Sequence, residues 1–73
     1  MKIQIVYQSG ETVIYTCQSR NFSPDSQIFF MTKITGIEQD GIKHDTLLDN
    51  IIVPIVGNIK VISMVDINLE KVN

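Results

Sequence analysis

The sequence predicts an all-β protein, and its composition and patterning give the reasons. Isoleucine occurs thirteen times and valine seven, against three leucines and no alanine. Residues branched at Cβ favour strands, while the good helix formers among apolar residues are scarce. Polar and apolar residues alternate over short segments that Gly, Pro, Asn and Asp separate. We expect one domain over residues 1–73, with a core so small that self-association is a common route to extra burial.

The N-terminal segments predict a β-hairpin. Residues 2–8, KIQIVYQ, place Ile3, Ile5 and Tyr7 on one face, with the period of two that a half-buried strand shows. Ser9-Gly10 then allows a tight turn. Residues 11–17, ETVIYTC, alternate again and put Cys17 in phase with the apolar face of the second strand.

The middle of the chain predicts a loop, a long strand and a second hairpin. Residues 18–26, QSRNFSPDS, are typical of a connecting loop, with Pro24 at the first inner position of a turn. Residues 27–35 form the most apolar strand, in which Phe29 and Phe30 must point to opposite faces. A bulge at Gly36 would let this strand bend. Asp40-Gly41 predicts a hairpin turn between two short segments.

The C-terminal part predicts two further strands. Residues 50–55 form a strand in which Pro54 has no N–H to donate, so it belongs at an edge, a bulge or a strand end. Residues 56–58 form a tight turn, and residues 59–67 form the last strand. The polar tail after it is a segment where fraying is common.

The order of a G-E hairpin, a VPI segment, a tight turn and a final NIKVISM strand resembles the small SH3-like or Sm-like barrels of low-GC bacteria and their phages. The resemblance extends from Ile3 to Ile67. It implies a five-stranded SH3-like barrel, and a platform that oligomerises through edge strands and hosts many functions. The alternative fold is an open antiparallel sheet that completes its core in a dimer.

Charge and export signals narrow the function classes. The net charge is −2, and the six Lys and Arg residues are scattered, so one monomer offers no basic stripe for a phosphate backbone. Residues 1–8 lack the apolar run of a signal peptide, and no apolar run reaches the length of a membrane span. The single cysteine rules out an internal disulfide and suits a reducing compartment. We expect a cytoplasmic protein that contacts no membrane.

Residues 36–50 hold the only histidine and half of the acidic residues, but the spacing matches neither a calcium loop nor a zinc site. Solvated residues around a hairpin turn explain these acids better. A catalytic pair of Cys17 and His44 would need proximity, an orienting group and a pocket, and a buried structural thiol is the better interpretation of Cys17. We therefore expect no enzyme, no metal and no cofactor.

The best functional candidate is the segment that contains Arg20, Asn21 and Phe22. It combines a planar cation, an amide and an aromatic ring, which recur at binding hot spots, although Phe22 could instead cap the end of the barrel. One ring of the Phe29-Phe30 pair adds apolar surface of the kind that marks an interface. The predicted binding residues are Arg20, Asn21, Phe22, Phe29 and Lys33.

Two functions follow from these residues. The first is a non-catalytic regulator or inhibitor of phage or mobile-element type, which forms a homo-oligomer and binds a partner protein. The second, which is disfavoured, is an oligomer that binds RNA or a nucleotide signal at anion sites between subunits. Such sites would be lined by Arg20, Lys33 or Lys60, and binding to them would weaken steeply with salt.

Overall fold

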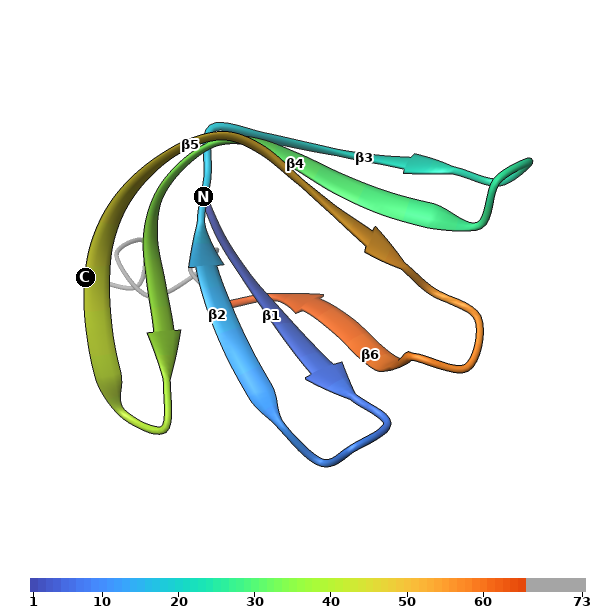
Figure 1. Cartoon of the computed structure of the whole chain (residues 1–73), viewed down its shortest axis with the longest axis horizontal. Helices are drawn as coiled ribbons and strands as arrows, with labels where there is room; N and C mark the ends of the chain where they lie inside the picture. Colours follow the sequence, from blue (N-terminus) through green and yellow to red (C-terminus); the bar gives the residue numbers. More distant parts are fainter. Residues whose placement is uncertain (66–73) are drawn as a thin grey trace, which may run out of the picture.

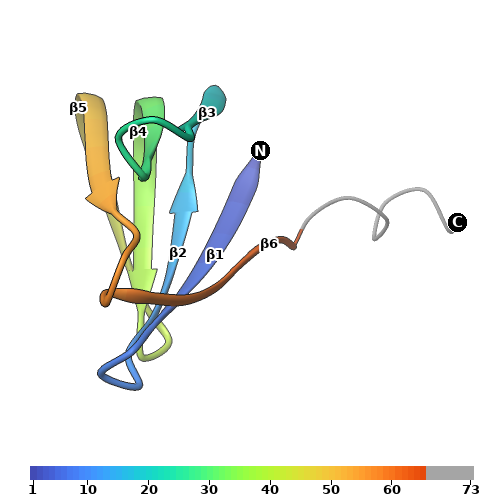
Figure 2. The same ribbon diagram turned by 90° about the vertical axis from the view of Figure 1, so that its right-hand side faces the viewer.

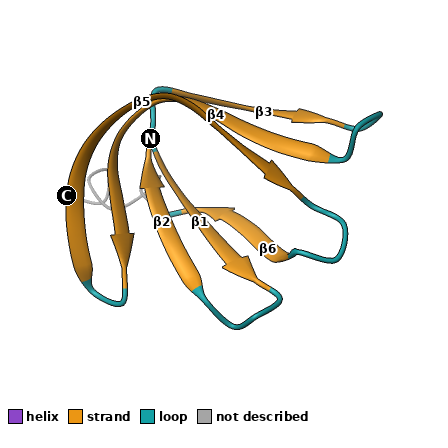
Figure 3. Cartoon of the chain, viewed as in Figure 1, coloured by secondary structure: helices purple, strands orange, loops and turns teal. Residues whose placement is uncertain are grey.

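A computed structural model of the chain describes residues 1–65, and the predicted all-β class is confirmed: this part contains strands and turns and no helix (Figure 3). No segment of it could therefore cross a membrane as a helix. The strands follow one another along the chain as β1 (Lys2–Tyr7), β2 (Thr12–Thr16), β3 (Ser19–Ser23), β4 (Ile28–Gln39), β5 (Ile42–Pro54) and β6 (Ile59–Met64).

All strand pairs are antiparallel, and together they form one curled, open sheet. The order across the sheet is β3-β4-β2-β1-β6, and β5 pairs with β4 on its other side. Because β4 is long, its first half pairs with β3 and its second half with β2. Figures 1 and 2 show the result as a half-barrel, in which β4 and β5 curve together over one end. Within residues 1–65 this is an open sheet, and closure into a five-stranded barrel is not observed.

The concave face of the half-barrel holds the core, and the predicted alternation decides which residues fill it. The buried side chains are Ile3, Ile5, Val13, Tyr15, Cys17, Phe29, Met31, Ile34 and Val53. The predicted burial of Cys17 is confirmed, since its side chain is 3% exposed. The N-terminal hairpin is confirmed as well, with Ile3 paired to Tyr15 and Ile5 to Val13.

The bend that the sequence predicts near Gly36 is present. The register between β4 and β5 shifts between Ile34 and Gly36, and Lys33 just before it has a φ of 52°. These irregularities place Met31 and Ile34, three positions apart, in the same core. An extra residue in a ladder bends the strand and increases its twist, so the two long strands can wrap around the core.

Three expectations about strands are corrected. Residues 19–23, expected in a loop, form β3, because each of them pairs with a residue of β4. The acids of residues 36–50 were expected to be solvated residues around a hairpin turn. Asp40 and Gly41 do form the predicted turn, with φ values of 56° and 77°, whereas Asp45 and Asp49 are exposed but lie in β5. Pairing with β4 outweighs the weak strand preference of Asp and Asn. The described chain therefore has six strands where the sequence predicts five.

The C-terminal expectations are met in part. Pro54 is the last residue of β5, and residues 55–58 form a turn in which the N–H groups of Asn58 and Ile59 both donate to the carbonyl of Ile55. The last strand ends at Met64. The predicted end of that strand, at Asp66 and Ile67, and the predicted fraying tail lie outside the described residues.

Candidate partner-binding site

Strand β3 brings Arg20, Asn21 and Phe22 onto one edge of the sheet. Phe22 is paired with Phe29, and Arg20 with Met31. Residues paired directly across an antiparallel ladder share a face, so Arg20 and Phe22 both project to the concave face that holds the core. Asn21 projects to the opposite, convex face. The three predicted residues therefore lie together, but on two faces of one strand.

Phe22 extends the core to the rim of the half-barrel. Its partner Phe29 is 5% exposed, whereas Phe22 is 47% exposed. The two rings belong to the same cross-strand row, and the row continues to the buried Val53 of β5. A large apolar side chain that ends a buried row with half of its surface in water is suited to contact another molecule.

Arg20 connects β3 to the far edge of the sheet. Its Nε donates to Sδ of Met64 on β6, at 3.2 Å. Sulfur is a weak acceptor, and a guanidinium carries further N–H donors beyond Nε. Arg20 is exposed, so it can present those donors beside Phe22 to a carboxylate.

The Asn21 amide serves the main chain of its own strand. Its Oδ1 accepts the N–H of Phe22 at 2.9 Å. On the convex face Asn21 is paired with Phe30, and Phe30 with Ile52. Phe30 is half-buried, and Ile52 is 60% exposed.

Phe29, one of the predicted binding residues, is buried. The sequence shows that Phe29 and Phe30 point to opposite faces, but not which of them points inward. Phe29 packs in the core beside Met31 and Val53, so its ring supports Phe22 from below and does not itself reach the surface. Phe30 is the ring on the convex face.

Lys33 lies at the bend, just past the end of the β3–β4 pairing, where Ser19 is paired with Thr32. Their hydroxyl groups are hydrogen-bonded to each other. Lys33 borders an open hollow whose other lining residues are Ile34, Thr35, Leu47, Leu48 and Asp49. Lys33 is thus close to Ser19, the first residue of β3, but it does not lie on the free edge of that strand.

Sequence reasoning missed two leucines of β5. Leu47 is 88% exposed and Leu48 is 42% exposed, at the corner where the register shifts. Adjacent residues of a strand cannot both face one core, and this rule already signals that one of two consecutive leucines is left outside. β5 pairs with β4 and with no other strand among residues 1–65, so these side chains flank an unpaired edge.

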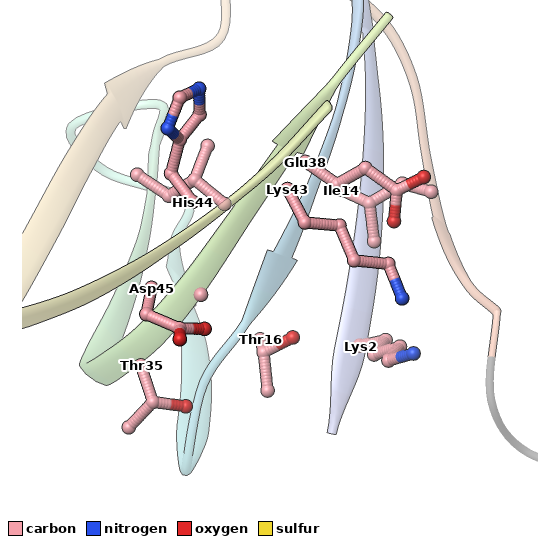
Figure 4. Close-up of a pocket in the computed structure, with 10 residues that line it drawn as sticks. Lys2, Ile14, Thr16, Thr35, Glu38, Lys43, His44 and Asp45 are labelled. Atoms are coloured by element: carbon pink, nitrogen blue, oxygen red, sulfur yellow. The ribbon is translucent and has the colours of Figure 1, made fainter. Parts of the chain in front are cut away.

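A second open hollow, about 250 Å³ in volume, lies on the convex face over Gly36, which has no side chain to fill it (Figure 4). Its charged and hydroxyl side chains are those of Lys2, Thr16, Thr35, Glu38, Lys43 and Asp45. Two cations and two anions share the space, so it has no net charge to select an ion of either sign. Figure 4 shows the His44 ring pointing away from the others.

The residues considered for catalysis and metal binding are dispersed. Cys17 is in the core, and a reactive thiol needs exposure and a positively charged environment, whereas His44 is exposed on β5. Within residues 1–65, no three His, Cys, Asp or Glu side chains are grouped so that they could hold a metal ion.

Comparisons with protein-family models, with curated proteins and with solved structures find no match for this chain.

Proposed function

We propose that this protein is a non-catalytic interaction protein that binds a partner protein through β3, as a small regulator or inhibitor of phage or mobile-element type does. The observation that carries the proposal is the half-exposed ring of Phe22 at the end of a cross-strand row that continues through the buried Phe29 and Val53, with Arg20 on the same face. Aromatic and arginine side chains dominate binding energy at protein interfaces. Both stand on a strand that the core supports, which is how rigid scaffolds present binding residues.

The proposal includes self-association through the unpaired edge of β5. An exposed edge strand with large apolar side chains invites pairing with another chain. Leu47, Leu48, Ile42 and Ile52 are exposed large hydrophobic residues of this strand. A homo-oligomer would cover this surface, while β3, on the other side of β4, would stay available for the partner.

The proposal extends to the fold class and to location. We propose that the chain has the shape of the small SH3-like or Sm-like barrels, because its sheet is curled and its two long strands bend sharply. The Arg20–Met64 hydrogen bond joins β3 to β6, the strands at the two ends of the sheet order. The cytoplasm remains the proposed location.

The alternative function, binding of RNA or a nucleotide signal, has one favourable observation. Lys2 and Lys43 line the same hollow over Gly36. Glu38 and Asp45 line it too, and they oppose an anionic ligand. Arg20, Lys33 and Lys60 lie on three different strands, β3, β4 and β6.

The proposal is tested by affinity capture from a lysate of the source organism, with the wild-type protein and the Arg20→Ala/Phe22→Ala variant as baits. We expect mass spectrometry to identify a protein that the wild type retains and the variant loses. Its affinity for the purified wild type should change little between about 50 and 200 mM salt, whereas affinity for a nucleic acid would fall steeply over that range. Equal capture by both baits, or capture of nucleic acid alone, would contradict the proposal.

A further inference from the structure

The main-chain groups on the free edge of β3 can be assigned from the hydrogen bonds of β4. The carbonyl of Thr32 accepts the N–H of Gln18 at 3.0 Å, so Thr32 turns its main-chain groups toward β3. On the other side of β4, the N–H of Ile55 donates to the carbonyl of Gln27 at 3.0 Å. Main-chain groups alternate sides along a strand, so those of Phe29 and Met31 face β5.

It follows that Arg20 and Phe22 turn their own N–H and C=O groups away from β4. They stand opposite Met31 and Phe29 in the register, and residues that face each other across an antiparallel ladder either both bond to each other or both face outward. The Phe22 N–H agrees with this assignment, since it donates to Oδ1 of Asn21. β3 pairs with no strand on that side among residues 1–65.

The edge therefore offers main-chain and side-chain groups from the same two residues. The N–H and C=O groups of Arg20 and Phe22 lie along the edge, and their side chains lie on the concave face beside the core. The Asn21 amide covers the N–H of Phe22 through a local bond that costs little to exchange for a main-chain carbonyl. This local side-chain hydrogen bond protects the edge, but a partner's main-chain carbonyl can replace it.

We propose that β3 accepts an extended segment of the partner protein as an additional strand, with a carboxylate beside Arg20 and an apolar side chain against Phe22. This inference rests on the proposed function and specifies the class of partner segment. Strand addition draws affinity from main-chain hydrogen bonds and specificity from alternate side chains. A second copy of β3 fits less well, because SRNFS contains no acidic residue, and two paired copies would leave both Arg20 side chains without an opposite charge.

The test uses the full chain and two synthetic nine-residue peptides with Val at the odd positions and Thr at the even positions. The central residue is Glu in one peptide and Lys in the other, so that Val stands two residues from it on the same face. Two-dimensional ¹H–¹⁵N NMR should show shifts centred on β3, and the Glu peptide should bind at least about fivefold more tightly than the Lys peptide. Hydrogen exchange at the Arg20 amide should slow at least about tenfold at saturation. Absence of shifts in β3 at millimolar peptide, or equal affinities for the two peptides, would overturn the inference.

A matched pair of variants separates strand addition from side-chain contact. Arg20→Ala and Arg20→Pro both lack the guanidinium, but only the proline lacks the N–H. Proline is tolerated on an edge strand where the N–H faces outward, whereas Asn21→Pro, which removes a ladder bond to β4, should destabilise the fold. We expect the Glu peptide, and the captured partner, to bind Arg20→Pro at least about fivefold more weakly than Arg20→Ala.

Equal affinities of the two Arg20 variants would overturn strand addition and leave the proposed function standing, since the partner would then use side chains alone. If Arg20→Pro fails to fold, the hydrogen-exchange rate of the wild-type Arg20 amide decides whether the β3 edge is free. Protection of that amide in the isolated monomer would mean that the chain's own residues occupy the edge. Protection that grows with protein concentration would mean that a second copy does. Either result overturns the inference.

Discussion

Tyr15 shows how a single buried group links the core of this protein to pH. Its hydroxyl is hydrogen-bonded to that of Tyr7 at 2.9 Å, and its side chain is 8% exposed. Burial, together with this hydrogen bond, raises the pKa of Tyr15 well above the ordinary value of 10.0, because the phenolate would lose its hydration. Below that value both the folded and the unfolded chain keep the proton, and Tyr15 adds no pH dependence.

Stability should fall as the pH rises above about 10. There the unfolded chain ionises at Tyr15 while the folded chain keeps its proton, and the free energy of unfolding drops by up to about 1.4 kcal/mol per pH unit. Tyr15→Phe should show a shallower fall, although it is less stable at neutral pH by about 1 kcal/mol through the lost hydrogen bond. Urea unfolding between about pH 9 and 11 measures both slopes. Equal slopes would mean that Tyr15 ionises as easily when folded.

The bend in β4 puts a lysine in a backbone conformation that lysine seldom adopts. The φ of Lys33 is 52°, and a non-glycine residue held in the left-handed region costs on the order of 1 kcal/mol or more. Residues branched at Cβ fit that region worst. The register shift between Ile34 and Gly36 lies directly beside it, so the strain is local to the bend.

Substitutions at Lys33 should therefore rank by their tolerance of positive φ. Lys33→Gly should be neutral or stabilising by up to about 1 kcal/mol, and Lys33→Val should be destabilising by about 1–2 kcal/mol. Lys60→Val, at an exposed position of β6, is the control and should lie within about 0.5 kcal/mol of the wild type. Denaturant unfolding measures the order. A Lys33→Val protein as stable as the wild type would show that the bend does not depend on this residue.

At the scale of elements, periodicity predicts what is local and misses what depends on pairing. The alternation of Val13 and Tyr15 is enough to predict the N-terminal hairpin and its inward face, and Asp40-Gly41 is enough to predict its turn. Among residues 19–23 only Phe22 is of a type that favours strands. These residues pair because β4 is long enough to carry a second neighbour. Their strand conformation therefore depends on β4 and cannot be predicted from residues 19–23 alone.

The candidate site was predictable to a similar degree. Residue types alone selected Arg20 and Phe22, since an arginine and an aromatic ring stand beside polar groups. The strand pairing then added that they share the concave face, and that Phe29 lies beneath them in the core. Leu47 and Leu48 were missed because their segment was expected to flank a turn. Alternation signals that one of two consecutive leucines is exposed, but the exposure of both follows from the register shift between β4 and β5.

At the scale of the molecule, residues 1–65 have a small core and several large apolar side chains that are exposed. Nine residues are buried among those described, while Leu47 and Val56 are 88% and 75% exposed. A domain of this size rarely gains more than a few kcal/mol from its own core. Covering the β5 edge would add apolar burial, which is the physical reason to expect association.

Light scattering of the purified protein should show a concentration-dependent homo-oligomer and not an 8.3 kDa monomer. Leu47→Lys should weaken association at least about tenfold, equal to about 1.4 kcal/mol, with little effect on folding because the side chain is exposed. Val56→Lys is the matched control, since it removes an exposed apolar side chain from the turn after β5. A wild-type monomer at high concentration, or equal effects of the two substitutions, would contradict assembly through the β5 edge.

The central claim is that Arg20 and Phe22 bind a partner and are not needed to hold the fold together. It is tested by measuring the thermal midpoint and the partner affinity of the Arg20→Ala/Phe22→Ala variant on the same samples. We predict a midpoint close to that of the wild type and a binding free energy weakened by more than about 2 kcal/mol. A variant that unfolds early would show that Phe22 is a lid on the core. A variant that folds and binds normally would place the interface elsewhere, with the convex face around Phe30 as the next candidate.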